Sequence, residues 1–239
     1  MKVLELFAGT RSIGKAFETR DHEVFSVEWN KDFENIDLYA DIMTVTADDI
    51  LQKFGRPDVI WASPDCTTFS IAAISHHRRK NAVTGNLDPI SDYAKFCDAV
   101  DQHVLQLIRE LKPRFWFIEN PRGGMRKMTW MRGLPRYTVT YCQYGDTRMK
   151  PTDIWTNHPD PQFKPACKNG DPCHERSPRG ETVKKARRDG IILTWGGTSA
   201  LRNCVERSKI PDALCQHIVD ICEGTQTNEY GQQMIMEGM

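Results

Sequence analysis

Residues 59–70 of the chain read VIWASPDCTTFS, and this stretch decides the fold. An apolar run of strand length breaks off into polar, proline-containing sequence, and the thiol of Cys66 follows directly. Residues 115–121, FWFIENP, repeat the pattern and carry the carboxylate of Glu119. In an open α/β sheet, reactive groups gather beyond the carboxyl ends of the strands. We therefore expect Cys66 and Glu119 to lie close together and to do nucleophilic and acid/base work on one substrate.

Outward from this stretch, strand-like and helical patterns alternate along the chain. The expected strands are residues 2–6, 23–27, a short segment before Asp41, 57–62, 114–119 and 137–142. The turn over residues 7–14 is expected to open a first helix that runs to about Thr19. The other expected helices are residues 48–54, 92–111 and 211–222, with Ser91 or Asp92 capping the helix over 92–111. The predicted inner face of that helix consists of Tyr93, Phe96, Val100, Val104, Leu107 and Leu111. This alternation predicts an α/β fold, a doubly wound, Rossmann-like parallel sheet.

The sequence pattern changes after Trp155, which suggests a division of the chain into four parts. We predict a catalytic domain over residues 1–156 and a small irregular insert, rich in proline, glycine, cysteine and charge, over 157–203. A helix over 204–223 would return to the catalytic domain, and 224–239 would form a flexible tail. Residues 70–90 show no clear period, and a loop of that length is usually either functional or disordered.

Composition indicates an ordinary globular chain of 239 residues with 39% apolar residues and no net charge. No apolar run is long enough to span a bilayer, and the N-terminus enters a strand without a secretory pattern. We therefore expect a cytoplasmic protein whose 8 cysteines are reduced. Basic residues crowd the region 176–209, where a polyanion could bind, although a solvated surface is the more common explanation of such a run.

The turn after the first expected strand reads FAGTRSIG over residues 7–14. It lacks the G-x-G-x-x-G spacing of dinucleotide sites, and a simple glycine-tolerant turn explains it nearly as well. The residues that follow favour a cofactor. Glu28 can accept both hydroxyls of a ribose, Trp29 offers a flat face to an adenine, and Asp41 can accept a hydrogen bond from an exocyclic amine. Together they describe an adenosine pocket without a phosphate cradle, which S-adenosylmethionine would fit.

A second cluster of possible ligands lies in the insert. Cys167, Cys173 and His174 invite a zinc interpretation, with His158 or Cys142 as the fourth ligand. The spacing is not the usual Cys-x-x-Cys of structural zinc sites, and the cysteines could simply pack a small, loop-rich subdomain. We assign no metal from the sequence, and zinc stays open as an alternative.

The motifs, taken in order, resemble those of the cytosine-5 DNA methyltransferases. The similar segments are residues 4–9 with Gly14, 28–29, 41–42, 63–70, 119–121, 143–150 and 207–211. They span residues 1 to about 222 in the order typical of the family. Asp65 stands where the family has a proline beside the nucleophile, and a neighbouring carboxylate disfavours a thiolate. The family's Arg-x-Leu-Thr stretch is not found, and Arg207 and Ser208 replace the closing glycine and asparagine.

The resemblance implies S-adenosylmethionine-dependent methylation of carbon 5 of cytosine in double-stranded DNA by a compact, phage-like monomer. Cys66 would attack carbon 6 of a flipped-out base while Glu119 binds N3 and N4, with Arg148 or Lys150 favouring the thiolate. The implied cofactor-binding residues are Phe7, Ala8, Gly9, Thr10, Glu28, Trp29, Asp41, Ile42 and Pro64. The implied nucleic-acid-binding residues are Ser70, His77, Arg78, Arg79, Arg179, Lys184, Lys185 and Arg187. The insert would carry target recognition.

Two other functions are compatible with the same motifs. The family includes a tRNA-methylating relative, and a small recognition region would suit tRNA as the substrate. A non-catalytic nucleic-acid-binding protein that keeps the fold is a further alternative, with Asp65 as a sign of decay. The presence of Cys66, Glu119, Glu28 and Asp41 argues against that last alternative.

Overall fold

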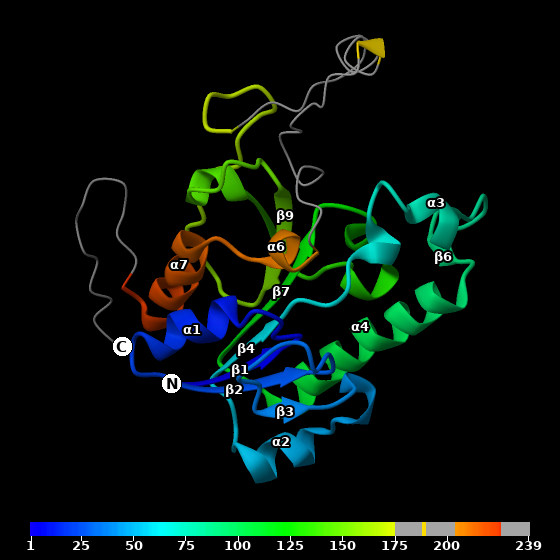
Figure 1. Cartoon of the computed structure of the whole chain (residues 1–239). Coiled ribbons are helices and arrows are strands. Elements are labelled where there is room, and N and C mark those ends of the chain that lie inside the picture. Colours follow the sequence, from blue (N-terminus) through cyan, green and yellow to red (C-terminus); the bar gives the residue numbers. More distant parts are fainter. Residues whose placement is uncertain (175–187, 190–203, 226–239) are drawn as a thin grey trace.

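The computed structural model describes residues 1–174, 188–189 and 204–225 (Figure 1). Its main sheet has the strand order β3-β2-β1-β4-β7-β9-β8. These strands are β1 (Lys2–Leu6), β2 (Glu23–Glu28), β3 (Leu38–Tyr39), β4 (Val59–Ala62), β7 (Phe115–Pro121), β8 (Arg136–Thr140) and β9 (Pro151–Thr156). A small antiparallel hairpin consists of β5 (Arg78–Lys80) and β6 (Leu87–Pro89). The predicted α/β, doubly wound, Rossmann-like sheet is confirmed.

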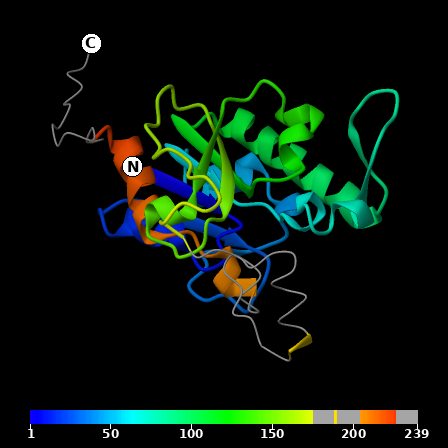
Figure 2. The same cartoon turned by 90° about the horizontal axis from the view of Figure 1, so that it is seen from above.

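Helices cover both faces of the sheet. They are α1 (Ser12–Glu18), α2 (Ala47–Lys53), α3 (Ile74–His77), α4 (Asp92–Leu111), α6 (Cys204–Ser208) and α7 (Asp212–Glu223). Short 3-10 turns join them: η1 (Ile42–Thr44), η2 (Thr67–Phe69), η3 (Met125–Lys127), η4 (Thr129–Met131) and η5 (Tyr141–Tyr144). In Figures 1 and 2, α1 and α7 lie on one side of the sheet, and α2 and α4 on the other. Among the described helices, none has the length and apolar character needed to cross a bilayer.

The pleat of the central strands explains why the sheet needs helices on both faces. Successive side chains of a strand point to opposite faces. In β1, Leu4 and Leu6 join the core beneath α2 and α4, while Val3 joins the core beneath α1 and α7. The central strands therefore bury side chains on both faces, as is typical of strands in the middle of an α/β protein, although Glu5 of β1 is a buried carboxyl.

The long helix α4 begins where the sequence predicted. Ser91 is its N-cap, and the Ser91 hydroxyl accepts a hydrogen bond from the Ala94 N–H at 3.1 Å. The predicted inner face is wrong at its first turn, because Tyr93 and Phe96 are 44% and 47% exposed. This end of α4 packs beside the β5–β6 hairpin rather than the sheet, and the Tyr93 ring meets the edge of His77. A helical period alone does not show where a sheet ends beneath a helix.

Strand β9 was not predicted, and it is the antiparallel member of the sheet. It pairs with β7 and with β8 in antiparallel register. Its sequence, PTDIWT, begins with a proline and buries Thr152, Asp153 and Thr156 completely. Asp153 is tolerated there because Arg126 forms an ion pair with it and the Thr138 hydroxyl donates to it at 2.8 Å. Residues 136–140 and 151–156 therefore form a hairpin-like pair, which brings residues 141–150 to the end of β7.

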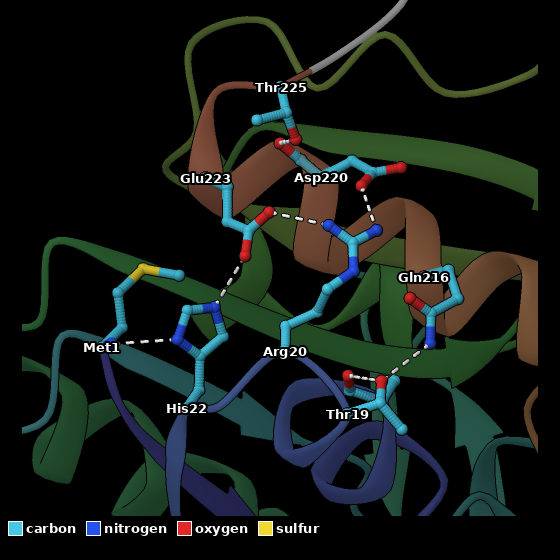
Figure 3. A network of polar contacts seen from close by, with 9 residues as sticks. Met1, Thr19, Arg20, His22, Gln216, Asp220, Glu223 and Thr225 are labelled. Carbon is cyan, nitrogen blue, oxygen red and sulfur yellow. Dashed lines mark hydrogen bonds and ion pairs between the residues drawn. The ribbon is translucent and has the colours of Figure 1, made fainter.

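Helix α7 packs its apolar side against α1, and a polar network secures its end (Figure 3). The Arg20 guanidinium donates to Asp220 at 2.8 Å and to Glu223 at 2.9 Å. The ring of His22 meets the same Glu223 carboxylate at 2.9 Å. Partly exposed ion pairs of this kind contribute little, so the buried apolar side of α7 supplies most of the attachment.

Candidate active site

The structure brings Cys66 and Glu119 to the same edge of the sheet. Strands β4 and β7 are adjacent and parallel, with Ala62 opposite Ile118. Cys66 lies four residues beyond the end of β4, as the N-cap of η2, and is half-buried. Glu119 lies in β7 and is only 6% exposed. The two side chains are close enough that the charge of Glu119 acts on the thiol.

The Glu119 carboxyl is buried and has hydroxyl donors as neighbours. Burial is the largest influence and raises the pKa of Glu119 above its ordinary value, while Lys150 and hydrogen bonds from Tyr141 and Ser63 oppose the rise. The Tyr141 hydroxyl donates to Oε1 at 3.3 Å. A carboxyl in these surroundings keeps its proton to a higher pH than an exposed one, and it can therefore donate that proton to a bound substrate.

The Cys66 thiol is likewise held in its neutral form. Burial raises its pKa to about 11, and the charges of Asp65 and Glu119 add to the rise. Lys150 opposes them. Asp65 has a structural reason to be there, since its carboxylate accepts from the Thr67 N–H at 2.7 Å and from the Thr67 hydroxyl at 3.2 Å. Asp65 thus stabilises the turn that contains Cys66, while its charge makes the Cys66 thiol less acidic.

The two predicted basic partners of the thiol occupy different places. Lys150 acts on both Cys66 and Glu119, and burial lowers the pKa of Lys150 below its ordinary value. Its ammonium lies 4.5 Å from the centre of the Tyr141 ring and donates to the Arg207 carbonyl at 3.0 Å. Arg148 instead forms an ion pair with Asp146, with Nε 2.8 Å from Oδ1. The structure therefore favours Lys150 over Arg148 as the cation beside the thiol.

The backbone of the loop after β1 adopts an unusual conformation. Phe7, Gly9 and Arg11 all have positive φ angles, of 58°, 49° and 57°. Residues other than glycine rarely adopt this region, and such strain is concentrated at functional sites. The Ala8 N–H donates to the Val27 carbonyl at 3.1 Å, which fixes the loop over the end of β2.

Glu28 joins this loop to the next one. Its Oε2 accepts from the Gly9 N–H at 3.0 Å, and its Oε1 accepts from the N–H groups of Trp29 and Asn30, both at 3.0 Å. The side chain of Trp29 is largely solvent-exposed, with the residue at 71%. A carboxylate anchored by three backbone donors, beside an exposed flat ring, fits the predicted ribose and adenine contacts.

The remaining predicted cofactor residues border the same edge of the sheet. Asp41 is exposed and accepts from the Met43 N–H at 3.0 Å at the start of η1, while Ile42 is buried behind it. Thr10 hydrogen-bonds Ser12 at 2.9 Å. Pro64 is buried, and its carbonyl accepts from the Asn120 amide at 3.1 Å, a bond that joins the ends of β4 and β7.

The predicted nucleic-acid contacts divide into three groups. Ser70 and His77 are partly exposed and Arg79 is exposed, at or near the β5–β6 hairpin. Arg78 is 3% exposed, so its burial argues against the predicted contact with phosphates. The other four predicted contacts, Arg179, Lys184, Lys185 and Arg187, lie outside the described residues.

Arg78 has a structural task instead. Its guanidinium donates to Asp98 at 2.6 Å and to the Thr68 hydroxyl at 2.9 Å, and it stacks 4.1 Å above the centre of the Phe69 ring. These bonds tie the hairpin to η2, the turn that carries Cys66. The burial of Arg78 could not be predicted from the polar sequence around it, because its partner Asp98 lies twenty residues away on α4.

Sequence reasoning also missed three polar residues of the site. Tyr141 and Ser63 hydrogen-bond the Glu119 carboxyl, and Asn120 joins the two strand ends. Asn120 belongs to the quoted Glu-Asn-Pro segment and could have been identified there. Tyr141 had no such signal, since its place depends on the unpredicted pairing of β8 with β9.

Comparison with known proteins agrees with this geometry. No family model matches the chain. A protein of Frog virus 3 (isolate Goorha), named "Probable DNA (cytosine-5)-methyltransferase", is 28% identical over 237 residues, which cover 93% of this chain and 100% of the viral protein. The predicted resemblance to the cytosine-5 methyltransferase family is thereby confirmed.

Two solved structures are also similar. One is a prophage-encoded E. coli protein assigned as a DNA modification methyltransferase, with 16% identity, a TM-score of 0.48 and coverage of 65% of this chain and 46% of the other. The second is the S. pombe Dnmt2 methyltransferase, with 17% identity, a TM-score of 0.46 and coverage of 65% and 50%. The matched part of each solved structure is therefore half of its length or less.

Proposed function

We propose that this chain methylates carbon 5 of cytosine in double-stranded DNA, with S-adenosylmethionine as the methyl donor. The observation that carries the proposal is the placement of a half-buried thiol, Cys66, and a buried carboxyl, Glu119, at the ends of adjacent strands. The viral relative, matched over its whole length, supports the choice of DNA.

The residues fit the proposed cofactor. Glu28, anchored by three backbone N–H groups, would face the ribose hydroxyls, and the exposed ring of Trp29 would stack on the adenine. The strained backbone at Phe7 and Gly9 would line the same pocket, with Ala8, Thr10, Asp41, Ile42 and Pro64 around it. When bound, S-adenosylmethionine supplies an electrophilic methyl group on a sulfonium.

In the proposed reaction, Cys66 does the nucleophilic work. After the thiol proton has left to solvent, the Cys66 thiolate would form a bond to carbon 6 of cytosine, and the ring electrons this displaces would make carbon 5 nucleophilic. Carbon 5 would then be placed to accept the methyl group that a bound S-adenosylmethionine would supply. Loss of the carbon 5 proton to a base then returns the electrons to the ring, and the Cys66–carbon 6 bond breaks.

Glu119 provides the matching acid. Its raised pKa keeps a proton available to cytosine N3, and a protonated N3 draws electrons away from carbon 6 as Cys66 attacks. Tyr141 and Ser63 hold the carboxyl in place. Lys150 lies where its charge favours the thiolate over the thiol. Arg148, bound to Asp146, would act only by shaping this loop.

A stacked base cannot reach these groups, so the target cytosine must be flipped out at a cost of a few kcal/mol. Ser70, His77 and Arg79 are placed to contact the flanking backbone. The insert over 157–203 would recognise the target sequence. The chain would act as a cytoplasmic monomer.

The test is mass spectrometry of nucleosides from DNA and, separately, from tRNA after incubation with the purified protein and S-adenosylmethionine. We expect 5-methylcytosine in DNA with the wild-type protein and none with Cys66→Ala. Product in tRNA alone would overturn the choice of substrate. An absence of product in both would overturn the proposed reaction.

A further inference from the structure

A second group of reactive side chains lies outside the proposed active site. Cys142 follows Tyr141 in η5, while Cys167, Cys173 and His174 come from the segment after β9. One ligand atom from each of the four lies within 4.8 Å of all the others. These three thiols and one imidazole come from two segments that are 25 residues apart in the sequence. They have no role in the proposed methyl transfer.

We propose that Cys142, Cys167, Cys173 and His174 bind one structural Zn²⁺. A tetrahedral ion with zinc–sulfur bonds of about 2.3 Å and a zinc–nitrogen bond of about 2.0 Å separates two sulfurs by about 3.8 Å, and sulfur from nitrogen by about 3.5 Å. The Sγ of Cys142 lies 3.1 Å from that of Cys167 and 3.6 Å from that of Cys173. The Nδ1 of His174 lies 3.7 Å and 3.5 Å from the sulfurs of Cys167 and Cys173. The four atoms therefore form a cage close to the size of a zinc tetrahedron.

The donor set favours zinc, in a structural role. Thiolate ligands select soft or borderline ions, and three sulfurs with one imidazole nitrogen is a usual structural zinc set. All four positions are taken by protein atoms, so no position remains open for a catalytic water. The site is independent of the proposed methyl transfer, and its test does not depend on that activity.

The turn between Cys167 and Cys173 explains how two cysteines with this unusual spacing can bind the same ion. A tight turn follows Cys167: the Lys168 N–H donates to the Asp171 carboxylate at 2.7 Å, and the Asp171 N–H donates to the Lys168 carbonyl at 3.1 Å. Gly170, with φ of 104°, reverses the chain within that turn. Five residues between the two cysteines thus return Cys173 to Cys167, as two residues do in shorter zinc motifs.

Neighbouring groups orient the ligands as the surroundings of metal sites do. The Cys167 N–H donates to the Thr140 hydroxyl at 3.0 Å, and the Gln143 amide donates to the Cys173 sulfur at 3.4 Å. One contact must change on binding. The Gly170 N–H points at Nε2 of His174 at 3.3 Å, and coordination through Nδ1 would put the ring proton on Nε2. A small movement of this turn would remove the conflict.

The metal would fasten the segment 167–174 to η5. Because Tyr141 begins η5 and donates to Glu119, the same ion would stiffen one wall of the proposed active site. It would also anchor the chain just before residues 175–187, which lie outside the described residues.

The test is elemental analysis of the wild-type chain, purified without chelators from cells supplied with zinc. We expect about one zinc ion per chain, lost in Cys142→Ser, Cys167→Ser and Cys173→Ser and kept in Cys97→Ala, which removes a buried thiol of α4. Replacement by Co²⁺ in the wild-type chain should give the strong visible absorption of a tetrahedral cobalt–thiolate site.

The cobalt spectrum needs no variant, so it decides the question even where a cysteine variant fails to fold. A wild-type chain without zinc and without the cobalt absorption would overturn the proposal. A disulfide between Cys142 and Cys167, found by mass spectrometry of the freshly purified, unreduced protein, would overturn it as well.

Discussion

Replacing Asp65 by asparagine should make the Cys66 thiol more acidic and more reactive. Asparagine keeps a side-chain oxygen that can accept from the Thr67 N–H, so the turn that presents the thiol stays closed. What is lost is the negative charge, which is the second-largest cause of the raised pKa of Cys66 after burial. The substitution therefore separates the electrostatic effect of Asp65 from its structural one.

The size of the effect follows from Coulomb's law. Asp65 is exposed, so an effective dielectric constant of about 40 to 80 applies, and neighbouring side chains interact over about 6 Å. One unit charge then changes the free energy of thiol ionisation by roughly 0.7 to 1.4 kcal/mol, which is about 0.5 to 1 pKa unit. A more acidic thiolate is also a weaker nucleophile, and this cancels nearly half of the gain. We expect alkylation about two- to fourfold faster at any pH below the pKa.

The assay is the rate of iodoacetamide modification at about pH 8, followed by mass spectrometry of the peptide that contains Cys66. Asp48→Asn is the matched control, because it removes an exposed carboxylate from the first turn of α2. An unchanged or slower rate in Asp65→Asn, with the control at the wild-type rate, would show that the charge of Asp65 does not hold the thiol in its neutral form.

Three further predictions concern other buried charges. Glu119→Gln should lower the methylation rate by about 10²- to 10⁴-fold while S-adenosylmethionine still binds, as measured by single-turnover kinetics and calorimetry; a near-normal rate would refute the role of Glu119 as the acid. Burial raises the pKa of Glu5 from 4.5 to about 7, so the wild-type chain should lose about 3 kcal/mol of folding free energy as pH rises through this window and Glu5→Gln should not lose it. Urea unfolding at about pH 4.5 and about pH 8 tests this, and parallel losses in both proteins would contradict it. Arg78→Met leaves the Asp98 carboxylate buried without its cation and should destabilise the fold by about 3 to 5 kcal/mol, whereas Arg79→Met should change stability by less than about 0.5 kcal/mol. Equal effects of the two substitutions would refute the structural role of Arg78.

Local signals in the sequence predicted most of the fold. Ser91 caps α4 because its hydroxyl meets an N–H three residues later, a relation contained within one turn. The apolar runs at 59–62 and 115–118 became neighbouring parallel strands, which placed Cys66 and Glu119 at one edge. Such features depend on residues close in the chain, or on the general rule that strand ends gather reactive groups.

What was missed depends on contacts between distant segments. Strand β9 carries polar residues that are buried only because Arg126 and β8 satisfy Asp153. The preference for Lys150 over Arg148 rests on Asp146, which forms an ion pair with the arginine. Arg78 was taken for a surface residue because its partner, Asp98, lies on another element. The ion-pair partner of a charged residue cannot be predicted from sequence when the partner lies on a distant segment.

The charges around Cys66 and Glu119 also constrain the order of events in the proposed reaction. Burial raises the pKa of both groups, to about 11 for Cys66, and a negative charge on either one opposes ionisation of the other. A thiolate beside a buried Glu119 carboxylate would be costly. The negative charge of Cys66 must therefore pass into the cytosine ring as the proton of Glu119 moves to N3. Lys150 donates a hydrogen bond to the Arg207 carbonyl, and its positive charge interacts with both Cys66 and Glu119. This charge lowers the free energy of the state in which one of the two groups is negatively charged.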